Sequence, residues 1–382
     1  MRQRIKIIGI NILIFLAGYI ILDLFLGLLK IPYDYNSFRI KHPYFHHGLK
    51  SNQAAMTAWG GLVYPVFTNS MSFRDSAVYR VEKDPDHRRI LILGDSHTEA
   101  VGVDFKYSFC GRLQQAAGER NIEILNAAAV SYSPRIHYLK TDYLLNKKGF
   151  RTDEIWVFVD ISDLQNEIAY EAFQPREEGY LYPFATKLRS FLKKRSFTWY
   201  TVGSAKDAKK ISAFVDKMKA FDPRALSNLH KNTVELYYDF FRDFNDEDML
   251  RSPEFHGVGE WYNDRGLIEL ADRGLELGQK NMAKLAELCR QHKIRLRLAV
   301  HPWQTQVLRQ DTMDYYVRSW KDFCDSEGID FINLFPVFIN GENPFTVTET
   351  YYIPEDNHWN EAGHELVAEH LLDLLNEDKP NV

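Results

Sequence analysis

Short apolar runs alternate with amphipathic stretches along most of the chain after residue 88. Apolar runs rich in β-branched residues predict strands buried on both faces of a sheet. We expect such strands at residues 89–93, 122–126, 155–159, 294–300 and 331–334. The intervening segments are long enough for right-handed helical crossovers, and we expect helices at residues 104–117, 134–148, 266–292, 311–326 and 361–376. The alternation predicts an α/β fold around a parallel sheet.

The regular spacing of the predicted strands breaks once. About 130 residues separate the third strand from the fourth, whereas a crossover needs only a dozen or more. We therefore expect an inserted, mainly helical subdomain at about residues 165–261. It holds many aromatic residues and a basic cluster at residues 193–195. A carbohydrate-contacting or lid surface is one interpretation, but aromatic residues at helical spacing are more typical of a core.

The N-terminal segment carries the longest apolar run in the chain. Residues 7–29 are apolar except for Asp23, and Arg2, Arg4 and Lys6 precede them. This run is long enough to cross a bilayer, and the basic flank should stay in the cytoplasm. We expect residues 1–30 to be an uncleaved single-pass anchor in a bacterial inner membrane, with the rest of the chain on the periplasmic side. A cleaved signal peptide is the alternative, but its apolar region would be shorter and would end in small residues.

Residues 31–87 show no clear periodicity and are rich in Pro, Tyr, Phe, His and Asn. We interpret them as a stalk and collar that lead into a catalytic domain at residues 88–382. His42, His46 and His47 in this segment are possible metal ligands. No cysteine or carboxylate stands at ligand spacing nearby, which favours ordinary surface histidines with satisfied hydrogen bonds.

Composition narrows the class of protein further. With 45% hydrophobic residues the chain can bury a large core, and its net charge of −5 offers no attraction for nucleic acid. Cys110, Cys289 and Cys324 are odd in number and far apart. They suggest neither a disulfide framework nor a metal site, and we expect them to be buried and inert.

Ser96 directly follows a predicted strand, in the run GDSHT at residues 94–98. This position lies at the carboxyl edge of a parallel sheet, where open α/β folds bind ligands. Glycine permits a sharp turn, after which a serine can project its hydroxyl while its own N–H faces a carbonyl oxygen. The tripeptide Gly-Asp-Ser also occurs in ordinary turns and helix caps. A second group is therefore needed to identify Ser96 as a nucleophile.

That second group lies near the C-terminus, in the run DNHWNEAGH at residues 356–364. Histidine can take the proton of a serine hydroxyl, and a carboxylate then holds the correct tautomer and stabilises the imidazolium. The sequence thus predicts a triad of Ser96, His358 and Asp356. Glu355 lies three residues before His358 and is the alternative acid.

Together these runs resemble the ordered motif blocks of SGNH/GDSL hydrolases, over residues 89–372. The run GDSHTEAVGV at 94–103 resembles GDSxTxGxGV, with Ala100 at one usual glycine. The last run resembles D-x-H-x-N-x-x-G, and NSMSFRD at 69–75 is similar to the N-x-x-G-F-R-D of membrane-attached members. The resemblance implies a three-layer α/β/α flavodoxin-like fold with a central parallel sheet. It also suggests supporting residues, namely Asp95, Asp163 and Asn360.

Two middle blocks depart from the family at the oxyanion hole. In NAAAVS at residues 126–131, the usual glycine whose backbone N–H binds the oxyanion is replaced by Ser131. In DISD at residues 160–163, the usual side-chain amide donor is replaced by Ser162. A backbone donor survives such an exchange if φ permits, whereas losing one donor costs on the order of 10²-fold in rate. His301 begins the run HPWQ at the same predicted edge, as a substrate wall or as a packed loop.

The anchor, the triad and the resemblance lead to one main hypothesis. They imply a serine esterase or O-acyltransferase acting on an acylated carbohydrate, such as a cell-surface or exported polysaccharide. The backbone N–H groups of Ser96 and Ser131, with Ser162, would hold the oxyanion, and neither a metal nor an organic cofactor is required. Two alternatives stay open. One is a catalytically weak glycan-binding or envelope-assembly module, and the other is a lipase or phospholipase at the membrane surface.

Overall fold

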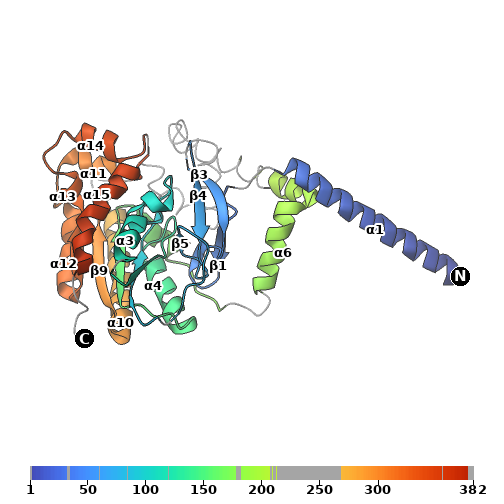
Figure 1. The fold of residues 1–382 in the computed structure, drawn as a ribbon, viewed down its shortest axis with the longest axis horizontal. Helices are drawn as coiled ribbons and strands as arrows, with labels where there is room; N and C mark the ends of the chain where they lie inside the picture. Colours follow the sequence, from blue (N-terminus) through green and yellow to red (C-terminus); the bar gives the residue numbers. More distant parts are fainter. Residues whose placement is uncertain are drawn as a thin grey trace. The chain divides into compact units, whose positions relative to one another are not determined.

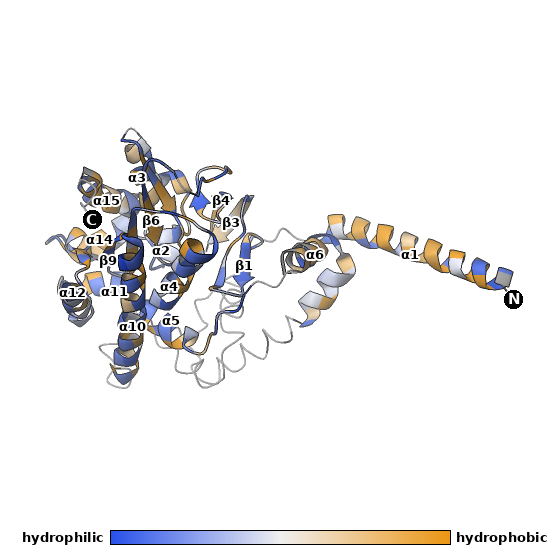
Figure 2. Ribbon diagram, turned by 90° about the horizontal axis from the view of Figure 1, so that it is seen from below, coloured by the Kyte–Doolittle hydropathy of each residue, from blue (hydrophilic) through white to orange (hydrophobic). Residues whose placement is uncertain are grey.

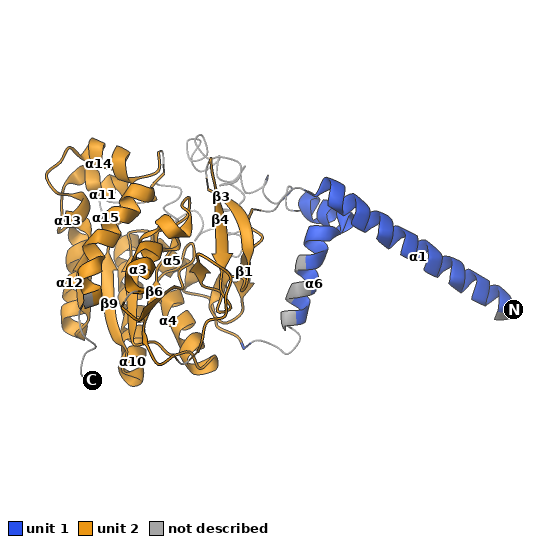
Figure 3. Cartoon of the chain, viewed as in Figure 1, with its two compact units in different colours: residues 1–34, 177–242 blue, residues 35–176, 243–382 orange. Residues whose placement is uncertain are grey.

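The protein is described by a computed structural model covering residues 2–31, 35–59, 61–83, 85–118, 120–177, 182–206, 209, 212, 268–354 and 356–376. The chain forms two compact units (Figure 3). One comprises residues 1–34 and 177–242, and the other comprises residues 35–176 and 243–382. All candidate site residues lie in the second unit, which also contains the sheet.

Five parallel strands form one side of that sheet, close to the positions that the apolar runs predict. They lie in the order β7-β6-β8-β9-β10, which is the flavodoxin-like order. Every residue of β8 is buried, as expected for a strand covered on both faces. The strands are β6 (Arg88–Leu93), β7 (Ile122–Asn126), β8 (Glu154–Val159), β9 (Arg295–Val300) and β10 (Asp330–Asn333).

Helices cover both faces of the sheet and make the three-layer α/β/α architecture (Figure 1). The helices α3 and α15 pack together on one face, and α4, α10 and α12 pack along the other. The long helices of the second unit are α3 (Phe109–Gly118), α4 (Pro134–Asp142), α5 (Asp163–Tyr170), α10 (Ile268–His292), α12 (Tyr315–Glu327) and α15 (Glu361–Leu371). The other helical segments of this unit are α2 (Ser96–Glu99), η1 (Phe105–Tyr107), η2 (Tyr143–Lys147), α11 (Gln304–Arg309), α13 (Phe335–Phe338), α14 (Pro344–Tyr351) and η4 (Leu372–Asn376).

The stalk and collar predicted at residues 31–87 contain strands that the sequence pattern did not reveal. Three of them extend the sheet beyond β7 in antiparallel pairing, so the complete sheet is mixed. They are β3 (Ala54–Trp59), β4 (Leu62–Thr68) and β5 (Arg74–Asp75), and a separate hairpin is formed by β1 (Arg39–His42) and β2 (His46–Leu49). The strands β3 and β4 are only partly buried, so they lack the continuously buried positions of a strand such as β8.

The histidines of the collar have hydrogen-bond partners, as the sequence suggests, but His42 is buried and does not lie at the surface. A ring nitrogen of His47 lies 2.7 Å from the Val130 carbonyl oxygen, and His42 Nδ1 accepts the Tyr44 N–H at 3.2 Å. The Nδ1 atoms of His46 and His47 lie 2.7 Å apart. The three histidines therefore have hydrogen-bond partners, one of which, Val130, lies outside the collar. Cys110, Cys289 and Cys324 are free and buried.

The first unit contains α1 (Arg2–Lys30) and α6 (Tyr182–Arg195). Residues 3–30 form one helix that is long and apolar enough to cross a membrane (Figure 2). A signal sequence near the N-terminus has the same properties. Asp23 of α1 accepts the Thr198 N–H at 2.7 Å, and the Tyr19 hydroxyl lies 2.7 Å from Thr198 Oγ1. The one acidic residue of the apolar run therefore has a hydrogen-bond partner.

Part of the insertion predicted at about residues 165–261 belongs to the sheet-containing unit, because α5 packs against α10. The segment from Glu177 onward, which includes α6, belongs to the other unit together with residues 1–34. Residues 213–267 lie outside the described residues.

Arg39 in β1 provides a test of how the collar is attached. Its guanidinium donates to both carboxylate oxygens of the fully buried Glu99, at 2.7 and 2.6 Å. Arg39→Ala would leave a buried carboxylate without its cation, and we expect it to lower the free energy of unfolding by about 3 kcal/mol. Arg290→Ala removes exposed ion pairs and should cost less than about 1 kcal/mol. Equal losses in chemical denaturation would contradict this account.

Candidate active site

Ser96 is the first residue of α2 and follows the carboxyl end of β6. Neighbouring β7 and β8 lie on opposite sides of β6, so Ser96 stands at the switch point of the sheet. Gly94 is required here by close packing, since a Cβ at this position would lie 2.1 Å from Thr98 Oγ1. Asp95 caps α2 by accepting the His97 N–H at 3.0 Å. These contacts fix the turn that carries the serine hydroxyl.

The far end of α2 is held by the collar motif at residues 69–75. The buried guanidinium of Arg74 donates to the carbonyl oxygens of Glu99, Ala100 and Val103, the last two at 2.5 Å each. Asn126 at the end of β7 donates to the Thr98 carbonyl at 2.6 Å. The orphan carbonyls of a short helix are thus satisfied by buried side chains. The FRD run therefore positions the helix that begins with Ser96.

Ser96, His358 and Asp356 lie together at this edge. Ser96 Oγ is 2.7 Å from His358 Nε2, and His358 Nδ1 makes a short hydrogen bond to Asp356 Oδ1. The same carboxylate oxygen accepts the His358 N–H at 2.9 Å. Burial opposes ionisation of Asp356, but attraction and hydrogen bonds from His358 outweigh it and hold the pKa of the carboxyl well below its usual range. The acid is therefore a carboxylate at neutral pH.

The loop around His358 is anchored on both sides. Gln304 donates to the Asp356 carbonyl at 2.6 Å, and the Ile353 N–H donates to the His358 carbonyl at 2.9 Å. Asn360 caps α15 by accepting the Gly363 N–H at 3.0 Å. Asn360 is thus a structural residue of this loop. Glu355, the alternative acid, lies outside the described residues.

Trp59 is a site residue that sequence reasoning missed. Its indole N–H donates to Asp356 Oδ2 at 2.8 Å, so both carboxylate oxygens have partners. Its ring also meets that of His358 edge-on, with centroids 4.9 Å apart. Trp59 ends β3, nearly 300 residues before Asp356 in the chain. No local motif signals such a contact, because only the added antiparallel strands bring the collar to this edge.

Three positions that carry glycine in the family motifs carry other residues here, and all three have positive φ. These are Ser72 at 65°, Ala100 at 62° and Ser131 at 62°. The chain thus keeps a glycine-type backbone at the cost of local strain. Next to Ser131, the Val130 N–H donates to Glu99 Oε2 at 2.8 Å, which fixes this turn. Among the described residues, neither the Ser96 N–H nor the Ser131 N–H donates within the protein.

The hydroxyl of Ser162, expected as an oxyanion donor, is directed instead to Asp160. This hydroxyl donates its single hydrogen to Asp160 Oδ1 at 2.6 Å, and the backbone N–H of Ser162 donates to the same oxygen at 2.7 Å. Asp163 is also turned inward and accepts the Asp160 N–H at 3.3 Å. Burial, together with the charges of Asp160, Asp95 and Glu167, raises the pKa of Asp163. The DISD run therefore builds a buried network beneath the serine.

His301 and Asp95 belong to that network, and so does His97, which sequence reasoning did not single out. His301 is fully buried, so it packs in the interior and forms no substrate wall. Burial would lower the pKa of His97, but Asp160 and Asp95 outweigh it and raise the pKa to about 10. Burial and the charge of Asp160 raise the pKa of Asp95. Two carboxylates and two imidazoles thus share one buried space.

No family model and no curated protein matches the chain. Solved structures do match it. An acetyl xylan esterase, AlAXEase, is 12% identical with a TM-score of 0.41, covering 75% of this chain and 98% of its own. An acetylxylan esterase from Geobacillus stearothermophilus, solved as a catalytic mutant, is 14% identical with a TM-score of 0.39, covering 79% and 100%. A putative lipolytic protein of the G-D-S-L family from Desulfitobacterium hafniense is 12% identical with a TM-score of 0.35, covering 75% and 98%.

The strain at Ala100 can be measured. A left-handed backbone costs a non-glycine residue about 1–2 kcal/mol, whereas glycine adds about 0.4–1 kcal/mol of unfolded-state entropy. We therefore expect Ala100→Gly to raise the free energy of unfolding by roughly 0.5–1 kcal/mol. Ala117→Gly, in the helical backbone of α3, should lower it by about 1 kcal/mol. Destabilisation by both variants in urea titrations would show that Ala100 is not strained.

Proposed function

We propose that the chain is a serine hydrolase of the SGNH type that cleaves or transfers an ester-linked acyl group. The observation that carries the proposal is the hydrogen-bonded series from Ser96 Oγ through His358 to Asp356. It stands at the carboxyl edge of the parallel strands, where substrates enter folds of this order. The motif blocks in the sequence support the same reaction class.

The geometry supports a stepwise acyl transfer. Ser96 Oγ attacks the ester carbonyl while His358 Nε2 takes the hydroxyl proton, and Asp356 stabilises the resulting imidazolium. His358 then returns the proton to the leaving alkoxide, which leaves an acyl group on Ser96. Water as acceptor completes an esterase cycle, whereas a sugar hydroxyl completes an O-acyl transfer. Both outcomes use the same acyl-enzyme.

The proposed oxyanion donors are the backbone N–H groups of Ser96 and Ser131. The positive φ of Ser131 supports this role, since it is a backbone conformation that glycine, the usual residue at this position, adopts readily. Ser162 is an unsuitable third donor in this arrangement, because its hydroxyl hydrogen is directed to Asp160. We therefore propose a two-donor hole, with a slower chemical step than a three-donor hole provides.

The proposed substrate class is an acylated carbohydrate outside the cytoplasm. The apolar helix at residues 3–30 supports membrane attachment, and its basic N-terminal flank supports a periplasmic position for the rest of the chain. A bacterial inner-membrane esterase or O-acyltransferase of an exported polysaccharide fits all of these features.

A second candidate function is a weakly catalytic module that binds glycan or supports envelope assembly. The hydroxyl of Ser162, engaged by Asp160, favours it because one expected oxyanion donor is missing. A covalent serine probe such as a fluorophosphonate separates the two candidates. Labelling of Ser96 supports the enzyme, whereas binding of acylated oligosaccharides without labelling supports the module.

Loss of the nucleophile gives the direct test. Ser96→Ala should lower the hydrolysis of p-nitrophenyl acetate by a factor on the order of 10⁴ or more, because no acyl-enzyme can form. Ser326→Ala, an exposed position on α12, should leave the rate unchanged. Hydrolysis at equal rates in wild type and Ser96→Ala would remove Ser96 from the mechanism.

Trp59 offers a finer test of the triad. Trp59→Phe keeps an aromatic ring but removes the donor to Asp356 Oδ2, so the carboxylate loses one of its fixed partners. We expect kcat to fall about tenfold with KM nearly unchanged, since a hydrogen bond to a charged group contributes about 1.5–3 kcal/mol. The matched control is Trp320→Phe, because the buried Trp320 N–H has no partner among the described residues. An effect confined to KM would instead place Trp59 in substrate binding.

A further inference from the structure

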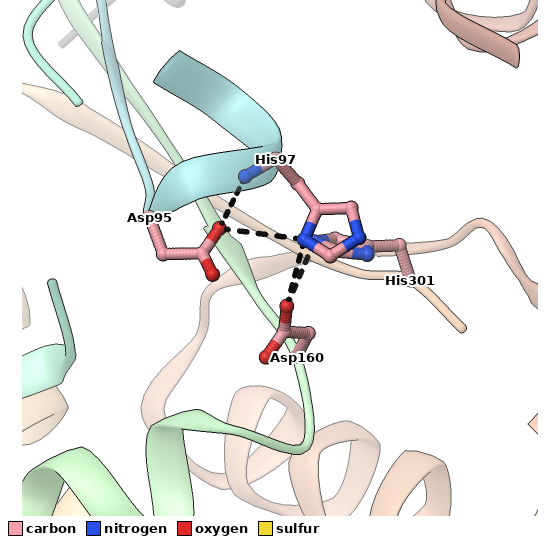
Figure 4. A group of neighbouring side chains, drawn as sticks. All are labelled: Asp95, His97, Asp160 and His301. Carbon is pink, nitrogen blue, oxygen red and sulfur yellow. Dashed lines mark hydrogen bonds and ion pairs between the residues drawn. The ribbon is translucent and has the colours of Figure 1, made fainter. Parts of the chain in front are cut away.

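Beneath the triad, four side chains from the ends of three adjacent strands point into one buried space (Figure 4). Asp95 and His97 follow β6, Asp160 follows β8, and His301 follows β9. None of the four is more than 4% exposed. The sheet order β6-β8-β9 alone brings them together, because the chain separates them by more than 200 residues.

The spacing of their donor atoms is that of a metal site. One nitrogen or oxygen from each residue lies within 4.8 Å of the others. His97 Nδ1 is 3.1 Å from Asp160 Oδ2 and 3.8 Å from Asp95 Oδ1, and His301 Nε2 is 3.9 Å from Asp160 Oδ2. Ligands about 2.0–2.2 Å from a tetrahedral zinc ion stand about 3.3–3.6 Å apart. The longer separations exceed this range by up to about 1 Å, so binding an ion requires side-chain shifts of that size.

The orientation of the His97 ring indicates that a positive charge lies between its Nδ1 atom and the carboxylate of Asp160. His97 Nε2 lies 2.8 Å from the Asn357 carbonyl oxygen, which can only accept, so Nε2 carries a hydrogen. In a neutral ring, Nδ1 is then a lone pair that faces the carboxylate of Asp160. A proton or a metal ion at Nδ1 resolves this repulsion. Donation of the other ring N–H to a backbone carbonyl is the usual support for a metal-binding histidine.

His301 distinguishes between the proton and the metal ion. It is fully buried, and among the described residues neither of its ring nitrogens makes a hydrogen bond of normal length and angle; Nε2 lies 3.9 Å from Asp160 Oδ2. A proton on His97 satisfies the contact with Asp160 and leaves His301 unmatched. A divalent cation satisfies His97, His301, Asp95 and Asp160 together, and it neutralises the two carboxylates.

The shell around the four residues also suits a metal site. Asp160 Oδ1 accepts from the Ser162 hydroxyl and backbone N–H, and Asp160 Oδ2 accepts the Trp303 indole N–H at 2.8 Å. These donors hold the carboxylate in one orientation while a lone pair of Oδ2 still faces His97. Such outer contacts orient the ligands of protein metal sites. They also explain why Ser162 turns away from the triad.

We propose that Asp95, His97, Asp160 and His301 bind one divalent transition-metal ion, with Zn²⁺ as the preferred ion. Two imidazoles and two carboxylates suit zinc, and four protein ligands with no open position are typical of a structural site. The ion joins the loops after β6, β8 and β9 and so holds the turn that carries Ser96. This inference goes beyond the proposed ester chemistry, and its test does not depend on any substrate.

The test is metal analysis of the full-length protein, purified in detergent without chelators or a polyhistidine tag. We expect about one Zn²⁺ per chain by inductively coupled plasma mass spectrometry. Removal of the ion with dipicolinate should lower the melting temperature of the protein, and added Zn²⁺ should restore it. His301→Ala should reduce the bound zinc to less than about a tenth of an ion per chain. His137→Ala is the matched control, since His137 is equally buried, lacks hydrogen-bond partners among the described residues and lies outside the cluster.

Either of two results would overturn the proposal. One is wild-type protein that holds less than about a tenth of a divalent ion per chain, both as purified and after incubation with Zn²⁺ and desalting. The other is undiminished zinc in His301→Ala. If His301→Ala does not fold, Co²⁺ added to the chelated wild type decides, because a tetrahedral site gives an intense visible d–d spectrum and an absent band refutes the site.

Discussion

The site depends on keeping one very short helix in place. The helix α2 has four residues, far fewer than a helix needs to be stable alone. Its start is capped by Asp95, its end is held by Arg74, and Asn126 ties its middle to β7. Glu99, its last residue, is paired with Arg39 of the collar. The position of Ser96 is thus determined by buried polar contacts from the collar and sheet rather than by helix propensity.

The same buried contacts link the two sides of the proposed reaction centre. Glu99 accepts hydrogen bonds from both Arg39 and the Val130 N–H, so it connects the helix of Ser96 to the turn of Ser131. His97 reaches the Asn357 carbonyl, which connects the serine turn to the loop of His358. Preorganised donors and a fixed base are what acyl transfer requires. A cation at the four-residue cluster would add a third link at the same level of the sheet.

Glycine-type backbone without glycine recurs at the points where these loops turn. Ser72, Ala100 and Ser131 all have positive φ, and each lies in a loop held by buried hydrogen bonds. The contacts that hold these loops also offset the strain, as expected where tertiary structure over-determines a backbone. Motif comparison identifies these positions as departures. Only the dihedral angles show that these three residues adopt the positive φ that glycine adopts readily.

The sequence by itself determined the parallel strands, the main helices and the pairing of Ser96 with an Asp-x-His loop. Apolar runs and local motifs report directly on burial and on residues close in the chain. Only the tertiary structure decided that strands within residues 54–75 join the sheet. It also decided that Trp59 donates a hydrogen bond to Asp356 and that Ser162 donates one to Asp160. It also decided that Asp95, His97, Asp160 and His301 converge. The physical reason is that these contacts follow from strand order, which brings distant residues to one edge without leaving a periodic signal.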